Sequence, residues 1–186
     1  MNKLFCFAIL FFTVFTAKVQ DDASTTKSVT NLSIISPALT HEMAIGKRQT
    51  IFVAAQLGLI ARYENINNTT TNAYYGLILK LTADFRNYYN FERRLLKGKN
   101  IDNNSGNYLA LRTGYTFAPT INKDQFTNYN NGFMLGGVWG IQRVYNSGIY
   151  LGLSLGGGIL FGNQKLDYAG MGDFHLGFNI GASSKK

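Results

Sequence analysis

The stretch "GIYLGLSLGGGILFG" (residues 148–162) alternates between large apolar side chains and small or polar ones. Its odd positions carry Ile149, Leu151, Leu153, Leu155, Ile159 and Phe161. Its even positions carry Tyr150, Gly152, Ser154, Gly156, Gly158 and one large aliphatic residue, Leu160. A period of two is the period of a β-strand, whose successive side chains point to opposite faces. The stretch therefore predicts a strand with one apolar face and one face almost free of bulky side chains.

The same alternation recurs along most of the chain. Five further segments show it, at residues 51–63, 73–86, 107–117, 132–142 and 174–181. Strands of soluble proteins usually have about 5–6 residues, whereas a tilted membrane strand needs roughly 9–11. All of the segments except 174–181, which has eight residues, are long enough for a membrane strand. Their mean hydropathy cannot distinguish the two classes, because a polar face cancels an apolar one and the chain average is -0.05.

The composition of the two faces indicates what surrounds them. In a soluble sandwich or lipocalin the apolar face packs inward, and the solvated face is rarely rich in glycine. In an outer-membrane barrel the apolar face meets lipid, and small residues on the other face keep a narrow lumen from being overpacked. Aromatic residues also gather near the segment ends, as in the interfacial girdles of such barrels. The predicted fold class is all-β, a transmembrane antiparallel up-and-down β-barrel.

The strand number follows from parity, since bacterial single-chain barrels have an even number of strands. Six segments follow residue 50, and residues 30–46 hold the remaining signal. The alternation there changes phase at Ser36-Pro37, where a turn gives eight strands and a mere bulge gives seven. We predict eight, with both termini in the periplasm.

A count of eight strands also predicts which connections are periplasmic and which are external. The short turns at 46–49 and 145–148 are then periplasmic, and the segments 65–72, 120–131 and 162–172 are external loops. The longest and most basic connection, 88–106, is then periplasmic as well.

The N-terminus predicts export. "MNKLFCFAILFFTVFTA" has Lys3, an apolar run and a small-residue site at Thr16-Ala17, as a cleaved signal peptide does. We therefore divide the chain into a signal peptide (1–17), a short polar segment (18–27) and an outer-membrane barrel (28–186), with the cell outer membrane as its location. Cleavage removes Cys6, so the mature chain has no thiol for a disulfide, a nucleophile or a metal.

The net charge restricts the partners. The full chain carries +8, and removal of Lys3 with the leader leaves 17 basic against 10 acidic residues. A basic exported protein is attracted to anionic lipid or glycan surfaces, although ordinary charge on loops and termini explains the excess equally well. The expected partners are outer-membrane lipid or lipopolysaccharide and the barrel assembly machinery. We expect a monomer, and no nucleic acid.

The polar side chains on the lipid-averted face form the first candidate site. They are Glu42, Arg62, Glu64, Lys80, Asp84, Arg86, Arg112, Gln142 and His175. Charges on this face must pair with each other or meet water. A salt-bridge network that plugs the lumen is the first interpretation, because eight-stranded barrels are generally filled by their own side chains. A narrow ion or solute path, or a ligand site, is the alternative.

Catalytic patterns are weak. Only His41 and His175 could serve as bases, and both are expected to be lumen or rim residues. Gly152-Leu153-Ser154-Leu155-Gly156 matches G-x-S-x-G, but it lies inside an alternating strand with no following helix, so we discard it as a nucleophile motif. No metal-binding or cofactor-binding spacing is present. We expect no catalytic site, no cofactor and no metal.

A basic segment between two predicted strands is the second candidate site. "FERRLLKGK" places Arg93, Arg94, Lys97 and Lys99 beside aromatic residues. It is either a basic amphipathic turn at the membrane rim, attracted to lipid phosphates, or a solvated connector.

Three blocks of the sequence carry a resemblance. "SPALTHEMAIG" (36–46), "YYNFERRLLKGKNIDNNSGNYLALRTGY" (88–115) and "DFHLGFNIG" (173–181) resemble a family of small predicted outer-membrane β-barrel proteins of Gram-negative bacteria, most of which have no assigned function. The resemblance implies location and fold, and supplies no catalytic residues. The chain departs from typical outer-membrane barrels in ending on "GASSKK" instead of a terminal aromatic residue, which leaves Phe178 as the residue to serve as assembly signal.

Three functions remain open from the sequence. The first is an integral outer-membrane barrel of structural, adhesive or ligand-binding type without a catalytic site. The second is a membrane-embedded enzyme that modifies lipid or lipopolysaccharide. The third is a soluble, periplasmic, lipocalin-like binding barrel.

Overall fold

The structure, a computed structural model, describes residues 25–66, 70–119, 131–162 and 165–180, without the side chains of 60–72 and 165. Eight strands follow one another along the chain: β1 (Val29–Ile35), β2 (Ala38–Ala44), β3 (Gln49–Ile66), β4 (Thr70–Asn87), β5 (Gly106–Thr116), β6 (Gly132–Val144), β7 (Ile149–Gly162) and β8 (Lys165–Ile180). Two short helical elements, α2 (Phe91–Leu96) and η1 (Asp102–Asn104), lie between β4 and β5.

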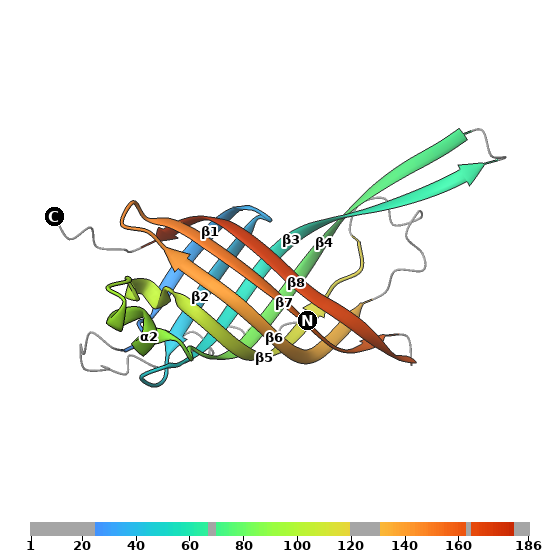
Figure 1. The fold of residues 1–186 in the computed structure, drawn as a ribbon. Helices are drawn as coiled ribbons and strands as arrows, with labels where there is room; N and C mark the ends of the chain where they lie inside the picture. Colours follow the sequence, from blue (N-terminus) through green and yellow to red (C-terminus); the bar gives the residue numbers. More distant parts are fainter. Residues whose placement is uncertain (1–24, 67–69, 120–130, 163–164, 181–186) are drawn as a thin grey trace, which may run out of the picture.

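Every strand pairs antiparallel with its neighbour in sequence, and β1 pairs with β8 to close the sheet into a barrel (Figure 1). The predicted all-β, eight-stranded, up-and-down architecture is confirmed. Among the described residues, no helix combines the length and the apolar character needed to cross a membrane.

The first hairpin explains why the alternation changes phase. Ser36 adopts a left-handed backbone conformation with φ of 54°, and with Pro37 it forms a two-residue turn between β1 and β2. The turn places Leu32 opposite Leu39. Partners on facing strands share a face, so even positions of β1 and odd positions of β2 both point outward. The turn at Ser36-Pro37 is confirmed.

The two ends of the barrel differ. We call one the helix end: it holds α2, η1, the β2–β3 and β6–β7 turns, the start of β1 and the end of β8 (Figure 1). At the opposite end, the hairpin end, β3 and β4 run well beyond the other strands as a two-stranded arm (Figure 1). The connection 88–106 therefore shares an end with the short turns, as eight strands require.

The predicted bounds of two external loops are wrong. Strands β3 and β4 extend into 65–72 as far as Ile66 and from Thr70, and β7 and β8 extend into 162–172 as far as Gly162 and from Lys165. Residues 120–130 of the third predicted loop lie outside the described residues.

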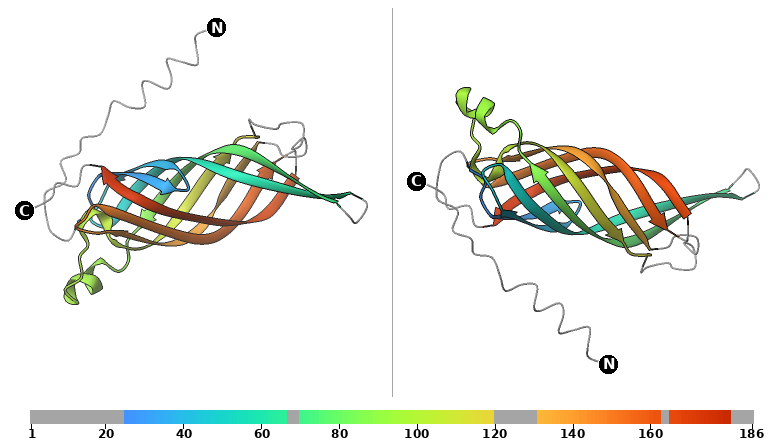
Figure 2. Two further views of the ribbon diagram at one scale, coloured as in Figure 1. Left: turned by 90° about the horizontal axis from the view of Figure 1, so that it is seen from above. Right: turned by 90° about the horizontal axis from the view of Figure 1, so that it is seen from below.

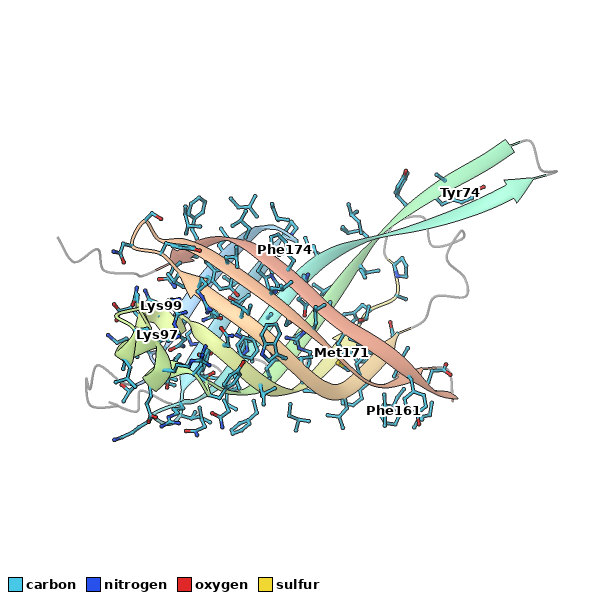
Figure 3. The ribbon with its side chains drawn as sticks, in the orientation of Figure 1. Tyr74, Lys97, Lys99, Phe161, Met171 and Phe174 are labelled. Atoms are coloured by element: carbon cyan, nitrogen blue, oxygen red, sulfur yellow. The ribbon has the colours of Figure 1, made fainter. Side chains whose placement is uncertain are left out.

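The strands carry their apolar face outward. Large exposed side chains on this face include Leu32, Leu39, Leu57, Leu81, Phe85, Leu111, Leu135, Trp139, Leu155, Phe161 and Phe174. Phe161 and Phe174 are labelled in Figure 3 on two of these strands. Among the strand side chains that the structure describes, Arg143, near the end of β6, is the one charged residue at an outward position. The buried polar and charged side chains of the strands, among them Thr40, Asp84 and Arg112, point inward.

Inward glycines make room for large rings. A Cβ atom added to Gly140 would collide with the ring of Tyr108, and one added to Gly152 would lie 2.7 Å from the hydroxyl of Tyr150. Both tyrosines are buried. The interior is therefore filled by a few large side chains beside residues that have none, which refines the prediction that small residues prevent overpacking.

Candidate functional site

Six charged side chains meet inside the barrel, contributed by four of its strands. The carboxylates are Glu42 of β2, Asp84 of β4 and Asp173 of β8. The cations are Lys80 and Arg86 of β4 and Arg112 of β5. Acids and bases balance within this cluster, which we call the interior network.

Arg112 lies at the centre of the interior network and is 2% exposed. Its Nε and Nη2 donate to the two carboxylate oxygens of Asp84 at 2.7 and 2.8 Å. Its Nη1 donates to Asp173 at 2.5 Å and to the Ser154 hydroxyl at 3.0 Å. Asp173 also accepts from Lys80 Nζ at 2.6 Å. A bidentate guanidinium–carboxylate pair is among the strongest of such contacts, and here it joins β4 to β5. The bonds to Ser154 and Asp173 extend the contacts of Arg112 to β7 and β8.

Arg86 joins the centre of the network to the helix end. Its Nε lies 3.1 Å from Asp84 Oδ2, and its Nη1 donates to Gln142 Oε1 at 3.0 Å. The guanidinium carbon lies 3.4 Å from the ring centroid of Phe52 and 4.3 Å from that of Tyr108. Aromatic faces stabilise a desolvated cation by attraction to the ring quadrupole. Carboxylate, amide and aromatic groups around Arg86 therefore offset the cost of removing its guanidinium from water.

Glu42 is fully buried, and three donors satisfy its carboxylate. They are Thr50 Oγ1 at 2.5 Å, Tyr88 Oη at 2.8 Å and Gln142 Nε2 at 2.9 Å. Burial and the nearby Glu42 carboxylate hold the pKa of Tyr88 well above its usual range. The phenol therefore remains a hydrogen-bond donor.

The connection between β4 and β5, residues 88–105, closes the helix end of the interior; we call it the base segment. Tyr88 and Phe91 are buried and stack with ring centroids 4.8 Å apart. The Asn104 side chain accepts from the Lys27 backbone N–H at 2.8 Å and donates to the Lys27 carbonyl at 2.7 Å. Gln142 Nε2 also donates to the Asn103 carbonyl at 3.3 Å. Tyr88 and Asn103 of the base segment thus extend the interior network to the helix end of the barrel.

The predicted lumen residues divide into three groups. The structure joins Glu42, Lys80, Asp84, Arg86, Arg112 and Gln142 in one hydrogen-bonded network. His175 is buried on the inner face, but its Nδ1 has no hydrogen-bond partner among the described residues. The side chains of Arg62 and Glu64 lie outside the part of the chain that the structure describes.

The prediction missed several members of the network. Asp173 precedes His175 by two residues and therefore shares its face, so the alternation itself could have found it. Tyr88 continues the inward even positions of β4 past the end of the strand. Ser154 lies at the centre of the discarded G-x-S-x-G match, and its role here is to accept a hydrogen bond from Arg112.

The two histidines show no catalytic arrangement. The His175 ring stacks on Tyr150 with centroids 6.3 Å apart, and no hydrogen bond between described residues joins it to Ser154. The prediction that His41 is a lumen or rim residue is wrong: β2 carries it exposed on the outer face, 2.8 Å from the Thr30 hydroxyl. Within the described ranges, no three His, Cys, Asp or Glu side chains are grouped as metal ligands.

The structure separates the four cations predicted for the basic segment. Arg93, Lys97 and Lys99 are exposed on or just after α2, and none forms an ion pair with another described residue. Lys97 and Lys99 are labelled in Figure 3. Arg94 is half-buried, and its Nε and Nη2 donate to the Asn100 carbonyl at 3.2 and 2.7 Å. Burial lowers the pKa of Arg94.

Arg94 lines a cavity of about 400 Å³ between the base segment and the β6–β7 turn. Its lining residues are Arg94, Asn100, Ser105, Arg143, Val144, Tyr145 and Asn146. The sequence pattern does not connect Arg143 with Arg94, because the two are far apart in the chain and meet only in the folded barrel. We call this cavity the basic pocket.

The comparisons with known proteins identify no relative. No protein-family model matches the chain, and no curated protein or solved structure shows a significant match. The resemblance to the outer-membrane family stays a prediction.

Proposed function

We propose that this protein is an integral outer-membrane β-barrel without catalytic activity, of structural, adhesive or ligand-binding type. Its barrel is a closed membrane anchor that presents the hairpin end to the outside. The outward face of the closed barrel is the observation that carries the proposal. It exposes large apolar side chains on all eight strands, and its one described charge lies near a strand end.

The distribution of polarity favours this proposal over a lipocalin-like protein. A soluble barrel buries its apolar face, whereas here the buried face holds six charged side chains and the apolar face is exposed. Strands β3 to β8 have 11 to 18 residues, which meets the roughly 9–11 needed to cross a membrane. Strands β1 and β2 have only seven residues each, so the barrel wall is shorter along these two strands than along the others.

The filled interior supports an anchor rather than a pore. Arg112, Phe52, Tyr150 and Gln142 are each at most 2% exposed, and the six network charges pair among themselves. A solute path would need unpaired polar groups facing water, so we expect no measurable conductance.

The ends of the barrel set the orientation that we propose. The helix end holds the start of β1, the end of β8 and the short turns, as the periplasmic end of an outer-membrane barrel does. The projecting β3–β4 arm then lies outside the cell, where binding or adhesion would take place. The barrel wall contacts phospholipid and lipopolysaccharide, the assembly machinery inserts the chain, and the protein is a monomer.

Fractionation with heat modifiability tests the proposal. We expect the protein in the outer-membrane fraction, with an SDS-gel mobility that changes on boiling because a closed barrel resists the detergent. Planar bilayers containing the purified protein should show no channel steps. A soluble periplasmic protein whose mobility does not change on boiling would refute the membrane assignment, and regular conductance steps would refute the plugged interior.

A further inference from the structure

The basic pocket lies on the outside of the barrel wall at the helix end. Arg143 reaches it from the outward face of β6, and Tyr145 and Asn146 follow in the β6–β7 turn. The base segment supplies Arg94 and Asn100 from the other side. Figure 2 shows that α2 stands out to the side of the barrel. The pocket therefore opens where the apolar wall ends.

The two arginines of the pocket bond only to neutral oxygens. Arg94 donates to the Asn100 carbonyl. Arg143 Nη1 donates to the carbonyls of Gly106 and Gln142 at 2.7 and 2.6 Å, and its Nη2 donates to Asn107 Oδ1 at 2.7 Å. No carboxylate among the described residues forms an ion pair with either guanidinium. Arg86 and Arg112, in the interior, each have such a partner.

An unneutralised pair of guanidiniums is a site for an anion. Nη1 of Arg94 donates to no described residue and is available to a ligand. Planar guanidiniums match the oxygens of a phosphate, and two of them beside one cavity can share a single phosphate group. The exposed Arg93, Lys97 and Lys99 add to the local positive potential without lining the pocket.

Exposed apolar side chains next to Arg94 along the chain indicate that the anion is attached to something apolar. Leu95 and Leu96, next to Arg94 in α2, are 40% and 89% exposed. Tyr89, at the start of the base segment, accepts a hydrogen bond from the outward Trp139 at 2.7 Å. Exposed aromatic and aliphatic side chains beside cations are typical of protein at the level of lipid headgroups. A free phosphate ion would gain nothing from these leucines.

We infer that the basic pocket binds the phosphate of an anionic glycerophospholipid of the membrane leaflet at the helix end, through Arg94 and Arg143. The inference rests on the proposed membrane location. The acyl chains extend along the apolar wall of β6, and Leu95 and Leu96 of α2 insert beside the glycerol. The pocket thereby fixes the depth of the helix end in the membrane.

Native mass spectrometry of the full chain in detergent micelles tests the inference. The protein is offered phosphatidylglycerol and phosphatidylcholine with identical acyl chains, with and without excess inorganic phosphate. The variant R94Q/R143Q is compared with R93Q/K97Q, which removes the same charge outside the pocket. We expect wild type to retain phosphatidylglycerol selectively, R94Q/R143Q to lose about tenfold or more in affinity, and the control to stay within about twofold.

Several outcomes would overturn the inference. Equal retention of the two lipids, or equal losses in both double variants, would mean that general charge attraction acts instead of the pocket. Displacement of phosphatidylglycerol by the excess inorganic phosphate would assign the pocket to free phosphate. Heat modifiability of the same samples separates the two proposals: a barrel that shifts on boiling but shows no lipid selectivity refutes the pocket alone, whereas a wild type that never shifts refutes both. If R94Q/R143Q does not shift, the single variant R94Q, which keeps every bond of Arg143, provides the comparison.

Discussion

Replacement of Arg112 by methionine tests whether the interior network stabilises the barrel. Arg112 is buried and donates four hydrogen bonds, three of them to carboxylate oxygens. Methionine keeps much of the volume of the side chain but none of its donors. The interior would then hold three carboxylates against two cations. Because solvent does not reach the site, it cannot screen the excess charge.

The expected loss follows from the cost of breaking a buried pair. Removing one partner and leaving the other charged typically costs about 3–5 kcal/mol of the free energy of unfolding. Asp84 keeps Arg86 and Asp173 keeps Lys80, so we expect the lower half of that range. In R112M/D84N the remaining charges balance, because Arg86 still faces Glu42 and Lys80 still binds Asp173. The double variant should therefore regain about 1–3 kcal/mol relative to R112M.

Urea titration of the protein in lipid vesicles measures these differences. The chain has one tryptophan, Trp139, on the outward face, so its fluorescence reports the loss of lipid contact, and gel mobility without boiling reports barrel closure. R93M, which removes an exposed cation, should lie within about 0.5 kcal/mol of wild type. The reasoning fails if R112M is as stable as R93M. It also fails if the free energy of unfolding that R112M/D84N loses equals the sum of the losses of R112M and D84N measured separately.

Three other substitutions test the packing, the outer face and the lower boundary of the interior, each by the same titration. A Cβ at Gly136 would collide with backbone of β7, whereas one at Gly137 meets nothing within 4 Å, so G136A should lower the free energy of unfolding by about 1–3 kcal/mol and G137A should not. L155R places a charge on the apolar wall and should cost about 2–4 kcal/mol; a loss below about 0.5 kcal/mol would argue against lipid at the wall. Y88F removes one of three donors to Glu42 and should cost about 1 kcal/mol, and a larger loss would show that the hydroxyl also holds the base segment in place.

The sequence predicted the barrel because one physical constraint acts on every strand. A strand that faces two different environments must alternate, and the alternation shows in residues 132–142 and 149–161 without any knowledge of their partners. The strand number came from a single local feature, the change of phase at Ser36-Pro37, which the two-residue turn explains.

The hairpin arm could not be predicted in the same way. Residues 65–72 are rich in Asn and Thr, which occur in loops and in exposed strands alike, so the sequence pattern does not tell the two apart. The strands continue because each of β3 and β4 finds its partner in the other, from Gln49 opposite Asn87 to Ile66 opposite Thr70. Pairing between neighbouring strands, and not alternation, extends this hairpin.

Alternation also predicts which residues share a face but not which of them touch. Arg112 contacts Asp84 because β4 and β5 pair in a register that places the two opposite each other. Asp173 joins them from β8 only because the sheet closes. Such contacts depend on the stagger of the whole barrel, which no single segment encodes.

The partners of each arginine decide what that arginine can do. Arg112 points into the barrel toward a carboxylate on the adjacent strand, so its charge is neutralised within the chain. Arg143 points outward, and its register partner on β7 is Leu151. A half-buried charge with only neutral oxygens around it is stabilised less than one with an acid, and an anion from outside the chain supplies the missing interaction. A charge removed from water needs a partner of opposite charge. The interior supplies that partner from within the chain and is therefore plugged, whereas the basic pocket lacks it and is therefore a binding site.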